Sequence, residues 1–284
     1  MTTKSFFPKT IDVNPTAKCN LDCNFCWGPD HRISNELTTD QWKYIISYFV
    51  KNGAESIIFT GGEPLVRIDI HDIIQYAYAL GSNITLSTNA MLLKNQAQEI
   101  LPYINQIGIP LDGSTQEKNK LMRGSLISFS LSIDALKLVR EKYPHIEITI
   151  RTLVSKVNID DVVNIAKLLV TITDYFDRWK IYKFIPISIG ANHNFEHWTS
   201  IDEFNSVVQE AESYFPQLRG KIICHLPDKE IGRYLFVGPQ GNLYSQVEPT
   251  SYKDIGNFFD IPEKSLKERL SQLIDAHKNS QHGR

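Results

Sequence analysis

The sequence predicts an α/β fold built on parallel strands, and three observations lead to this prediction. Strand-like apolar runs alternate with segments of helical period over the first two thirds of the chain. The chain has 284 residues, of which 42% are hydrophobic, which suffices to bury one large core. The polar and glycine-containing motifs fall at the C-terminal ends of the predicted strands, where β/α proteins place their chemistry. We therefore expect helices around a parallel sheet, with the site at the strand ends.

Six strands and five helices are expected in alternation. The predicted strands lie at 11–15, 55–60, 83–88, 105–112, 146–154 and 179–187. The predicted helices lie at 38–52, 69–80, 92–101, 125–142 and 159–173. Thr38 or Thr39 is expected to cap the first helix, with Asp40 near its positive end. A helix starting at Thr199 or Ser200 and two short apolar runs then predict a small α+β extension. We place the core at 1–190 and the extension at 191–284.

Composition excludes several classes of function. The net charge is −2, without the basic excess typical of nucleic-acid-binding proteins, so we expect no nucleic-acid partner. The few cysteines, the lack of an apolar run long enough to span a bilayer and the lack of a signal peptide predict a soluble protein. We therefore expect a reducing, cytoplasmic setting and no membrane partner.

Three of the four cysteines, Cys19, Cys23 and Cys26, lie within eight residues and directly follow a predicted strand. A tight loop with this spacing can turn three thiolates toward one soft metal centre and leaves a fourth position open. A structural zinc site would require a fourth ligand, and His31 is the candidate. A disulfide framework fits poorly, because Cys224 is distant from this cluster. An iron–sulfur cluster is therefore the favoured prediction.

This loop resembles the signature of the radical S-adenosylmethionine (SAM) superfamily, in which an aromatic residue directly precedes the third cysteine. Phe25 occupies that position, and a second resemblance is the segment Thr60–Pro64, which follows the apolar run Ile57–Phe59. The resemblance implies an incomplete (β/α)6 barrel. It also implies a [4Fe–4S] cluster on the three thiolates, with SAM chelating the open iron. One electron from the cluster then cleaves SAM to methionine and a 5′-deoxyadenosyl radical, which removes a hydrogen atom from the substrate.

The resemblance assigns a set of residues to the surroundings of SAM. They are Phe25, Gly61, Gly62, Glu63, Ser87, Asn89 and Arg123, with Arg151 competing for the role of Arg123. The two glycines would let the backbone approach a ligand. An arginine would bind the SAM carboxylate through two parallel hydrogen bonds. Taken alone, each motif also fits an ordinary turn or a surface ion pair. No residue is predicted to act as a catalytic acid or base, and we expect His31, His193 and His197 at the surface or in loops.

A narrower resemblance concerns the last third of the chain, which looks like viperin-type enzymes that dehydrate CTP. The matching segments are Val157-Asn158, Arg178–Tyr182, Leu226–Asp228 and Arg233–Leu235. Lys180 and Arg178 are the predicted contacts of a substrate triphosphate. Strand alternation would place Arg178, Lys180 and Tyr182 on one face and Trp179, Ile181 and Lys183 on the other. The turn Gly238–Gly241 stands where those enzymes carry a tyrosine, and Tyr244 is displaced from it.

Only Cys224 lies beyond the cysteine loop, so we expect no auxiliary cluster in the extension, which would cap the mouth of the barrel. The expected partners are a small-molecule substrate, with a nucleotide foremost, and a flavodoxin- or ferredoxin-type reductant. Three alternatives remain open: a CTP dehydratase, a peptide-modifying radical SAM enzyme, and a non-catalytic zinc-binding module. The reaction outcome is open too, between dehydration, dehydrogenation, epimerisation and group transfer.

Overall fold

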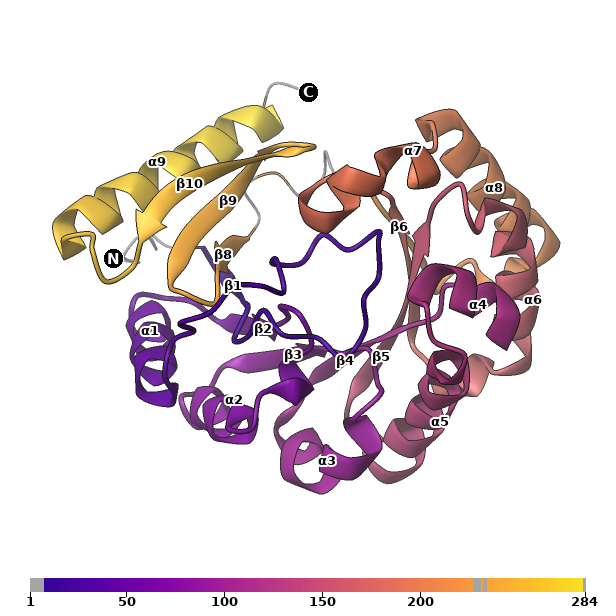
Figure 1. Cartoon of the computed structure of the whole chain (residues 1–284), viewed down its shortest axis with the longest axis horizontal. Coiled ribbons are helices and arrows are strands. Elements are labelled where there is room, and N and C mark those ends of the chain that lie inside the picture. The colour runs from indigo at the N-terminus through magenta and orange to yellow at the C-terminus, as the bar shows by residue number, and fades with distance from the viewer. Residues whose placement is uncertain (1–7, 227–230, 232–233, 283–284) are drawn as a thin grey trace. The chain divides into compact units, whose positions relative to one another are not determined.

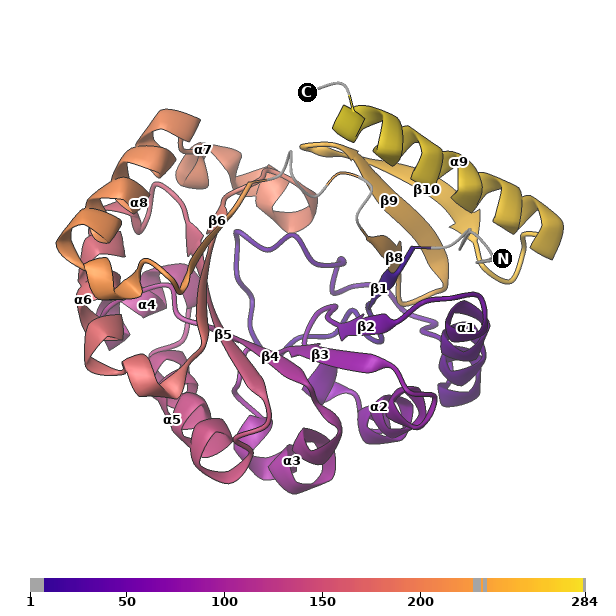
Figure 2. The same cartoon turned by 180° about the vertical axis from the view of Figure 1, so that it is seen from behind.

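The computed structural model describes residues 8–226, 231 and 234–282. These residues form two compact units. The first contains the described parts of 1–18, 29–86 and 227–284, and the second contains 19–28 and 87–226. Figures 1 and 2 show the elements of both units from opposite sides.

The first unit contains a sheet in the order β10-β9-β8-β1-β2-β3. Its strands are β1 (Thr10–Val13), β2 (Ser56–Phe59), β3 (Asn83–Ser87, whose last residue belongs to the second unit), β8 (Leu235–Val237), β9 (Asn242–Glu248) and β10 (Ser251–Asn257). Strands β8, β1, β2 and β3 are parallel, whereas β9 runs antiparallel to both β8 and β10. The first unit is therefore a parallel sheet that ends in an antiparallel hairpin.

The helices of the first unit are α1 (Thr39–Lys51), the short 3-10 helix η1 (Pro64–Val66), α2 (Ile70–Ala79) and α9 (Glu263–His282). Thr38 caps α1 as predicted: its hydroxyl accepts the Gln41 N–H, while its own N–H donates to the Gln41 side chain. The apolar face of α1 is buried through Trp42, Ile45 and Phe49. Helix α1 is thereby fixed at its first residue and packed along one face.

The second unit contains the parallel strands β4 (Gln106–Pro110), β5 (Glu147–Val154), β6 (Arg178–Lys183) and β7 (Ile222–His225), in that order. Its α-helices are α3 (Leu93–Ile100), α4 (Gln116–Arg123), α5 (Ile127–Lys142), α6 (Val162–Thr171), α7 (Asn194–His197) and α8 (Ile201–Tyr214). Its 3-10 helices are η2 (Leu101–Tyr103), η3 (Ile159–Asp161), η4 (Thr173–Tyr175), η5 (Ser188–His193) and η6 (Pro216–Leu218). Helices α5, α6 and α8 lie along one face of these strands in both views.

The two faces of β5 and β6 differ in burial, which decides where their polar side chains lie. On β6, Trp179 and Ile181 are fully buried, whereas Lys180 and Tyr182 are half-buried. On β5, Ile150 is fully buried and its neighbour Arg151 is half-buried. The predicted alternation of β6 is therefore confirmed, and Lys180 shares the less buried face with Arg151.

The predicted α/β class with a mostly parallel sheet is confirmed. All six strands predicted in the first two thirds of the chain form, within a few residues of their expected bounds. Helices α4, α7 and α9 were not predicted. Strands of the predicted extension join the sheets of both units, because β8 pairs with β1 and β7 pairs with β6. The division into a core and a capping extension at residue 190 stays a prediction.

Among the described residues, no helix is both long and apolar enough to cross a membrane.

Candidate active site

The three clustered cysteines lie on a turn of the second unit whose backbone points N–H groups at the sulfurs. The Cys26 N–H donates to the Cys23 carbonyl at 3.1 Å and closes the turn. The Leu21 N–H lies 3.4 Å from Cys19 Sγ, and the Gly28 N–H lies 3.3 Å from Cys26 Sγ. Such N–H donors stabilise negative charge on a ligating sulfur and tune the potential of an iron–sulfur cluster. The loop therefore suits thiolate ligands.

Burial disfavours the thiolate forms of Cys23 and Cys26. It raises the pKa of Cys23 to about 12, against the opposing effect of the Arg123 charge. Burial also raises the pKa of Cys26, although the hydrogen bond from Gly28 acts in the opposite direction. Because thiolates rather than thiols ligate metals, binding of a soft metal centre here would displace these protons.

Phe25, the aromatic residue before the third cysteine, packs inside the second unit. It forms a buried cluster with Cys23, Met122 and Phe184. The Arg123 guanidinium lies over its ring, 5.2 Å from the centroid. A cation above an aromatic face is attracted by the negative charge of that face. Phe25 thus ties the turn between Cys23 and Cys26 to the arginine that the resemblance assigns to SAM.

Arg123 is itself held by a buried carboxylate. It ends α4, and its Nε donates to Asp112 Oδ2 at 2.5 Å. The Asp112 side chain is fully buried and its other oxygen accepts the Leu153 N–H at 2.7 Å. Burial is the largest single effect and lowers the pKa of Arg123, but the Asp112 charge, the Cys23 charge and the hydrogen bond to Asp112 together outweigh it, so the pKa is raised. Arg123 is thus a permanent cation fixed beside the cysteine turn, and its contact with SAM stays a prediction.

Two more predicted residues, Ser87 and Asn89, also lie in the second unit. The Asn89 side chain donates to Asn20 Oδ1 at 2.6 Å and lies 3.8 Å from Cys19 Sγ. Asn89 therefore contacts the cysteine loop directly. The Ser87 hydroxyl accepts a hydrogen bond from the guanidinium of Arg151.

Arg151 fits against β4 because Gly108 has no side chain. A Cβ at Gly108 would lie 2.2 Å from Arg151 Nε. Within the described residues, that Nε is buried and has no hydrogen-bond partner. A buried guanidinium N–H without a partner is costly, so an acceptor from a ligand would stabilise this position.

The glycine-rich segment lies in the first unit, against the stretch of chain that leads into Cys19. The Gly62 N–H donates to the Thr16 carbonyl at 2.9 Å and the Glu63 N–H donates to the Lys18 carbonyl at 2.8 Å. Gly61 has a φ of +109°, which favours glycine. On the side where a Cβ would lie, the backbone of residues 14–18 fills the space beside both glycines. Their contact with SAM stays a prediction. Glu63 is buried and caps η1 by accepting the Leu65 N–H at 3.1 Å.

Gly62→Ala is expected to lower the free energy of unfolding by about 1–3 kcal/mol, the usual cost of overpacking. The added Cβ would lie 2.2 Å from the Lys18 carbonyl oxygen and 2.5 Å from that of Ala17, and a backbone cannot move aside cheaply. Urea denaturation measures the change. Gly220→Ala is the matched control, because a Cβ there has nothing within 4 Å. Equal denaturation midpoints for the two variants would contradict the packing argument.

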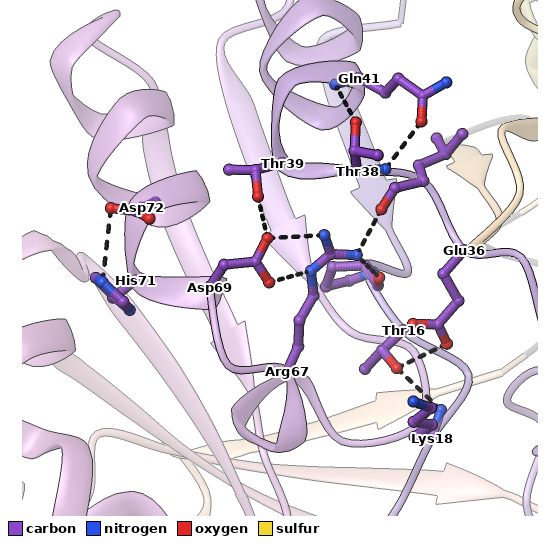
Figure 3. A network of polar contacts seen from close by, with 12 residues as sticks. Thr16, Lys18, Glu36, Thr38, Thr39, Gln41, Arg67, Asp69, His71 and Asp72 are labelled. Carbon is purple, nitrogen blue, oxygen red and sulfur yellow. Dashed lines mark hydrogen bonds and ion pairs between the residues drawn. The ribbon is translucent and has the colours of Figure 1, made fainter.

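Figure 3 shows how side chains of the first unit fasten the same stretch of chain. Arg67 donates from Nη1 to the carbonyls of Pro15 at 2.7 Å and of Leu37 at 2.9 Å, and it pairs with Asp69. Glu36 Oε1 accepts the Ala17 N–H at 2.7 Å. The same oxygen accepts the Thr16 hydroxyl at 2.8 Å. These contacts position residues 15–18, which directly precede the cysteine loop.

Two features of the site did not follow from sequence patterns. A buried polar cluster in the first unit joins Asp12, Asn14 and Thr60, and Asn14 donates to the Tyr244 hydroxyl at 2.8 Å. In the second unit, His197 is fully buried, so our placement of it at the surface was wrong. No local sequence pattern distinguishes a polar residue that is buried and paired with a distant segment from a polar residue at the surface. The one indication in the sequence for Asp12 is its position between the apolar residues Ile11 and Val13 of a predicted strand.

Comparisons with known proteins agree with this geometry. A family model described as the Radical SAM superfamily matches residues 13–169. An S-adenosylmethionine-dependent nucleotide dehydratase of Selenomonas ruminantium is 27% identical over 261 residues, which cover 87% of this chain and 89% of that protein. An AdoMet-dependent heme synthase of Methanosarcina barkeri is 31% identical over 57% of this chain. The chain spans about half of that protein, 47%.

A solved structure shows the same fold. The crystal structure of Streptococcus suis SuiB bound to S-adenosylmethionine matches with a TM-score of 0.70 and 17% identity, over 87% of this chain and 63% of that one. The Radical SAM superfamily uses a [4Fe–4S] cluster and S-adenosylmethionine. The resemblance predicted from the cysteine loop and the glycine-rich segment is confirmed, because the family model covers more than half of the sequence. This chain is an enzyme of the Radical SAM superfamily.

Proposed function

We propose that this enzyme binds one [4Fe–4S] cluster through Cys19, Cys23 and Cys26, cleaves SAM reductively and abstracts a hydrogen atom from a nucleotide. The arrangement of the cysteine turn supports the first part, since backbone N–H groups face two of the sulfurs. The ligands of such a cluster bind different iron atoms, so the three sulfurs do not need to meet at one point. When bound, the cluster supplies the electron that breaks a carbon–sulfur bond of SAM and yields a 5′-deoxyadenosyl radical.

The contribution of the protein is to hold and orient the reactants. Arg123 is a buried cation beside the cysteine turn, and it balances negative charge there. Asn89 fixes Asn20 and approaches Cys19. In the first unit, Gly61–Glu63 is bonded to the stretch that precedes Cys19. We propose these segments, with Ser87 and either Arg123 or Arg151, as the contacts of SAM. A flavodoxin- or ferredoxin-type protein is the proposed electron donor.

The observation that carries the substrate proposal is a pair of cations on the less buried face of the second unit. Arg151 on β5 and Lys180 on β6 are register partners and share this face. The Arg151 guanidinium extends to Ser87, and the Lys180 ammonium lies 5.2 Å from the centroid of the Tyr182 ring. Adjacent cations on one face bind phosphate oxygens through charge-assisted hydrogen bonds. Tyr182 shares this face, and its ring lies 4.5 Å from that of His225. Phosphate-binding cations beside aromatic rings fit a nucleotide.

Arg178, the other predicted phosphate contact, occupies a different place. It begins β6, whereas the functional residues of parallel β/α folds gather at the strand C-termini. Its Nε pairs with Glu147 at 2.9 Å, and its side chain is exposed. The substrate proposal therefore rests on Lys180 and Arg151 rather than on Arg178.

Dehydration is the outcome that we propose for the substrate radical. A relative that covers 87% of this chain, and of which this chain covers 89%, is named a nucleotide dehydratase. The viperin-like segments favour CTP among nucleotides, although Pro227, Asp228 and Arg233 of those segments lie outside the described residues. A peptide substrate is the second candidate, because the matching SuiB has also been solved with its precursor peptide.

Lys180→Ala is expected to raise the KM for the nucleotide roughly 10- to 100-fold, because the variant loses one charge-assisted hydrogen bond to the substrate. The assay measures substrate-dependent 5′-deoxyadenosine formation with a panel of nucleoside triphosphates and the parent nucleosides. For a nucleoside, which lacks the phosphates, we expect no difference between the variant and the wild type.

Lys183→Ala is the matched control on the same strand. Its ammonium lies 4.2 Å from the ring centroid of Trp198, and we expect the KM of this variant to be unchanged. A peptide that stimulates SAM cleavage where no nucleotide does would overturn the proposed substrate in favour of the second candidate.

A further inference from the structure

His197, a fully buried histidine at the end of α7, reaches into the cysteine loop from far along the chain. Its Nε2 lies 2.9 Å from Oδ1 of Asn24, the residue between Cys23 and Phe25. Its ring meets the ring of Phe25 edge-on, with the centroids 5.9 Å apart. One imidazole therefore contacts both residues that separate the second and third cysteines.

The neighbouring hydrogen bonds define the form of this histidine. The Asn24 amide N–H₂ donates to Glu196 Oε2 at 3.0 Å, which directs its carbonyl oxygen at His197. His197 Nε2 must therefore carry the hydrogen and donate it. Nδ1 then accepts from the Ser155 hydroxyl, 3.1 Å away. Burial lowers the pKa of His197, which agrees with a neutral ring.

The segment that carries His197 holds the same loop at two further points. The Gly190 N–H donates to the Cys26 carbonyl at 2.9 Å, and the Ser188 hydroxyl donates to the Gly28 carbonyl at 2.5 Å. A Cβ at Gly190 would lie 2.9 Å from the Phe25 carbonyl oxygen. The chain after β6 is thus built closely against the cysteine turn, and His197 is its buried anchor.

We propose that His197 is a positioning residue for the cluster: its hydrogen bond fixes Asn24, and thereby the geometry of the Cys23–Cys26 turn. This inference rests on the proposed function for its link to the cluster. Some residues orient metal ligands without contacting the metal. Their removal typically weakens metal binding by about 10- to 100-fold. His197 would act without touching a sulfur, because Asn24, the residue that it holds, lies between two of the proposed ligands.

Two substitutions at His197 separate its two hydrogen bonds. In His197→Gln, the side-chain amide reaches the position of Nε2 and can still donate to Asn24. In His197→Asn, the shorter amide reaches only the position of Nδ1, next to Ser155. We expect the Gln variant to behave like the wild type. The Asn variant should lose iron to a chelator about 10-fold faster and show an altered electron paramagnetic resonance spectrum of the reduced cluster.

A measurement on the protein without metal tests the inference independently of the cluster. Alkylation of Cys23 and Cys26 by iodoacetamide, followed by mass spectrometry, reports how firmly the turn is held. We expect alkylation to be about 10-fold faster in His197→Asn than in the wild type or the Gln variant. Asn24→Ala, which leaves the histidine in place, should have the same effect. Adding His197→Asn to Asn24→Ala should then change nothing further, because the two residues act through one bond.

The outcomes separate this inference from the proposed function. Equal chelation and alkylation rates in all variants would overturn the role of His197, even with a normal cluster in each. Additive effects of Asn24→Ala and His197→Asn would overturn the shared hydrogen bond. If the alkylation pattern appears but the wild type assembles no cluster, the turn is positioned as inferred and the proposed function fails. If His197→Asn does not fold, Asn24→Ala alone decides the result.

Discussion

Cys23→Ala is expected to abolish cluster assembly and to reduce 5′-deoxyadenosine formation to background. Three thiolates are the protein ligands available for a [4Fe–4S] cluster in this loop, and the turn between Cys23 and Cys26 has no second sulfur to replace the lost one. The measurement is anaerobic reconstitution with iron and sulfide, followed by iron analysis and by reduction with dithionite in the presence of SAM. Cys19→Ala and Cys26→Ala should give the same result.

Cys224→Ala is the matched control, because it removes the same chemical group from β7 and leaves the cysteine loop intact. We expect this variant to assemble about four iron atoms per chain and to cleave SAM like the wild type. About eight iron atoms per chain in the wild type would contradict the prediction of a single cluster. A colourless protein with one zinc ion would instead support the non-catalytic zinc-binding module.

Arg123→Met is expected to lower the free energy of unfolding by about 3–5 kcal/mol, the range for breaking a buried ion pair. The substitution keeps much of the side-chain volume but leaves the carboxylate of Asp112 buried with no opposite charge. The amide of Leu153 still donates to that carboxylate, and one neutral hydrogen bond cannot balance a full charge. Urea denaturation of the metal-free protein measures the change without interference from cofactor loss.

Two controls show whether burial causes this loss. Arg178→Met makes the same substitution in an exposed pair with Glu147, where we expect a cost of at most about 1 kcal/mol. Combining Asp112→Asn with Arg123→Met removes both charges and should recover a large part of the stability lost in the single variant. A similar cost for Arg123→Met and Arg178→Met would contradict the view that the Asp112 charge is desolvated.

Periodicity in the sequence predicted the strands because burial on a sheet leaves a pattern in consecutive residues. The alternation of Glu147–Val154 is an example: its even-numbered residues are buried and its odd-numbered residues are half-buried. Helix α4 was missed because Gln116–Arg123 has few apolar residues and is short. Helix α9 was missed for a related reason, since its polar faces weaken the periodic signal.

The sequence by itself determined the family and predicted the metal ligands, because cysteine spacing and the glycine-rich segment are local features of a few consecutive residues. Tertiary structure decided what holds those features in place. Only the fold shows that Gly62 packs on the chain before Cys19, that Asp112 neutralises Arg123, and that His197 anchors Asn24. The reason is physical: His197 and Asn24 are 173 residues apart in the chain, and hydrogen bonds over such separations leave no pattern in either local stretch.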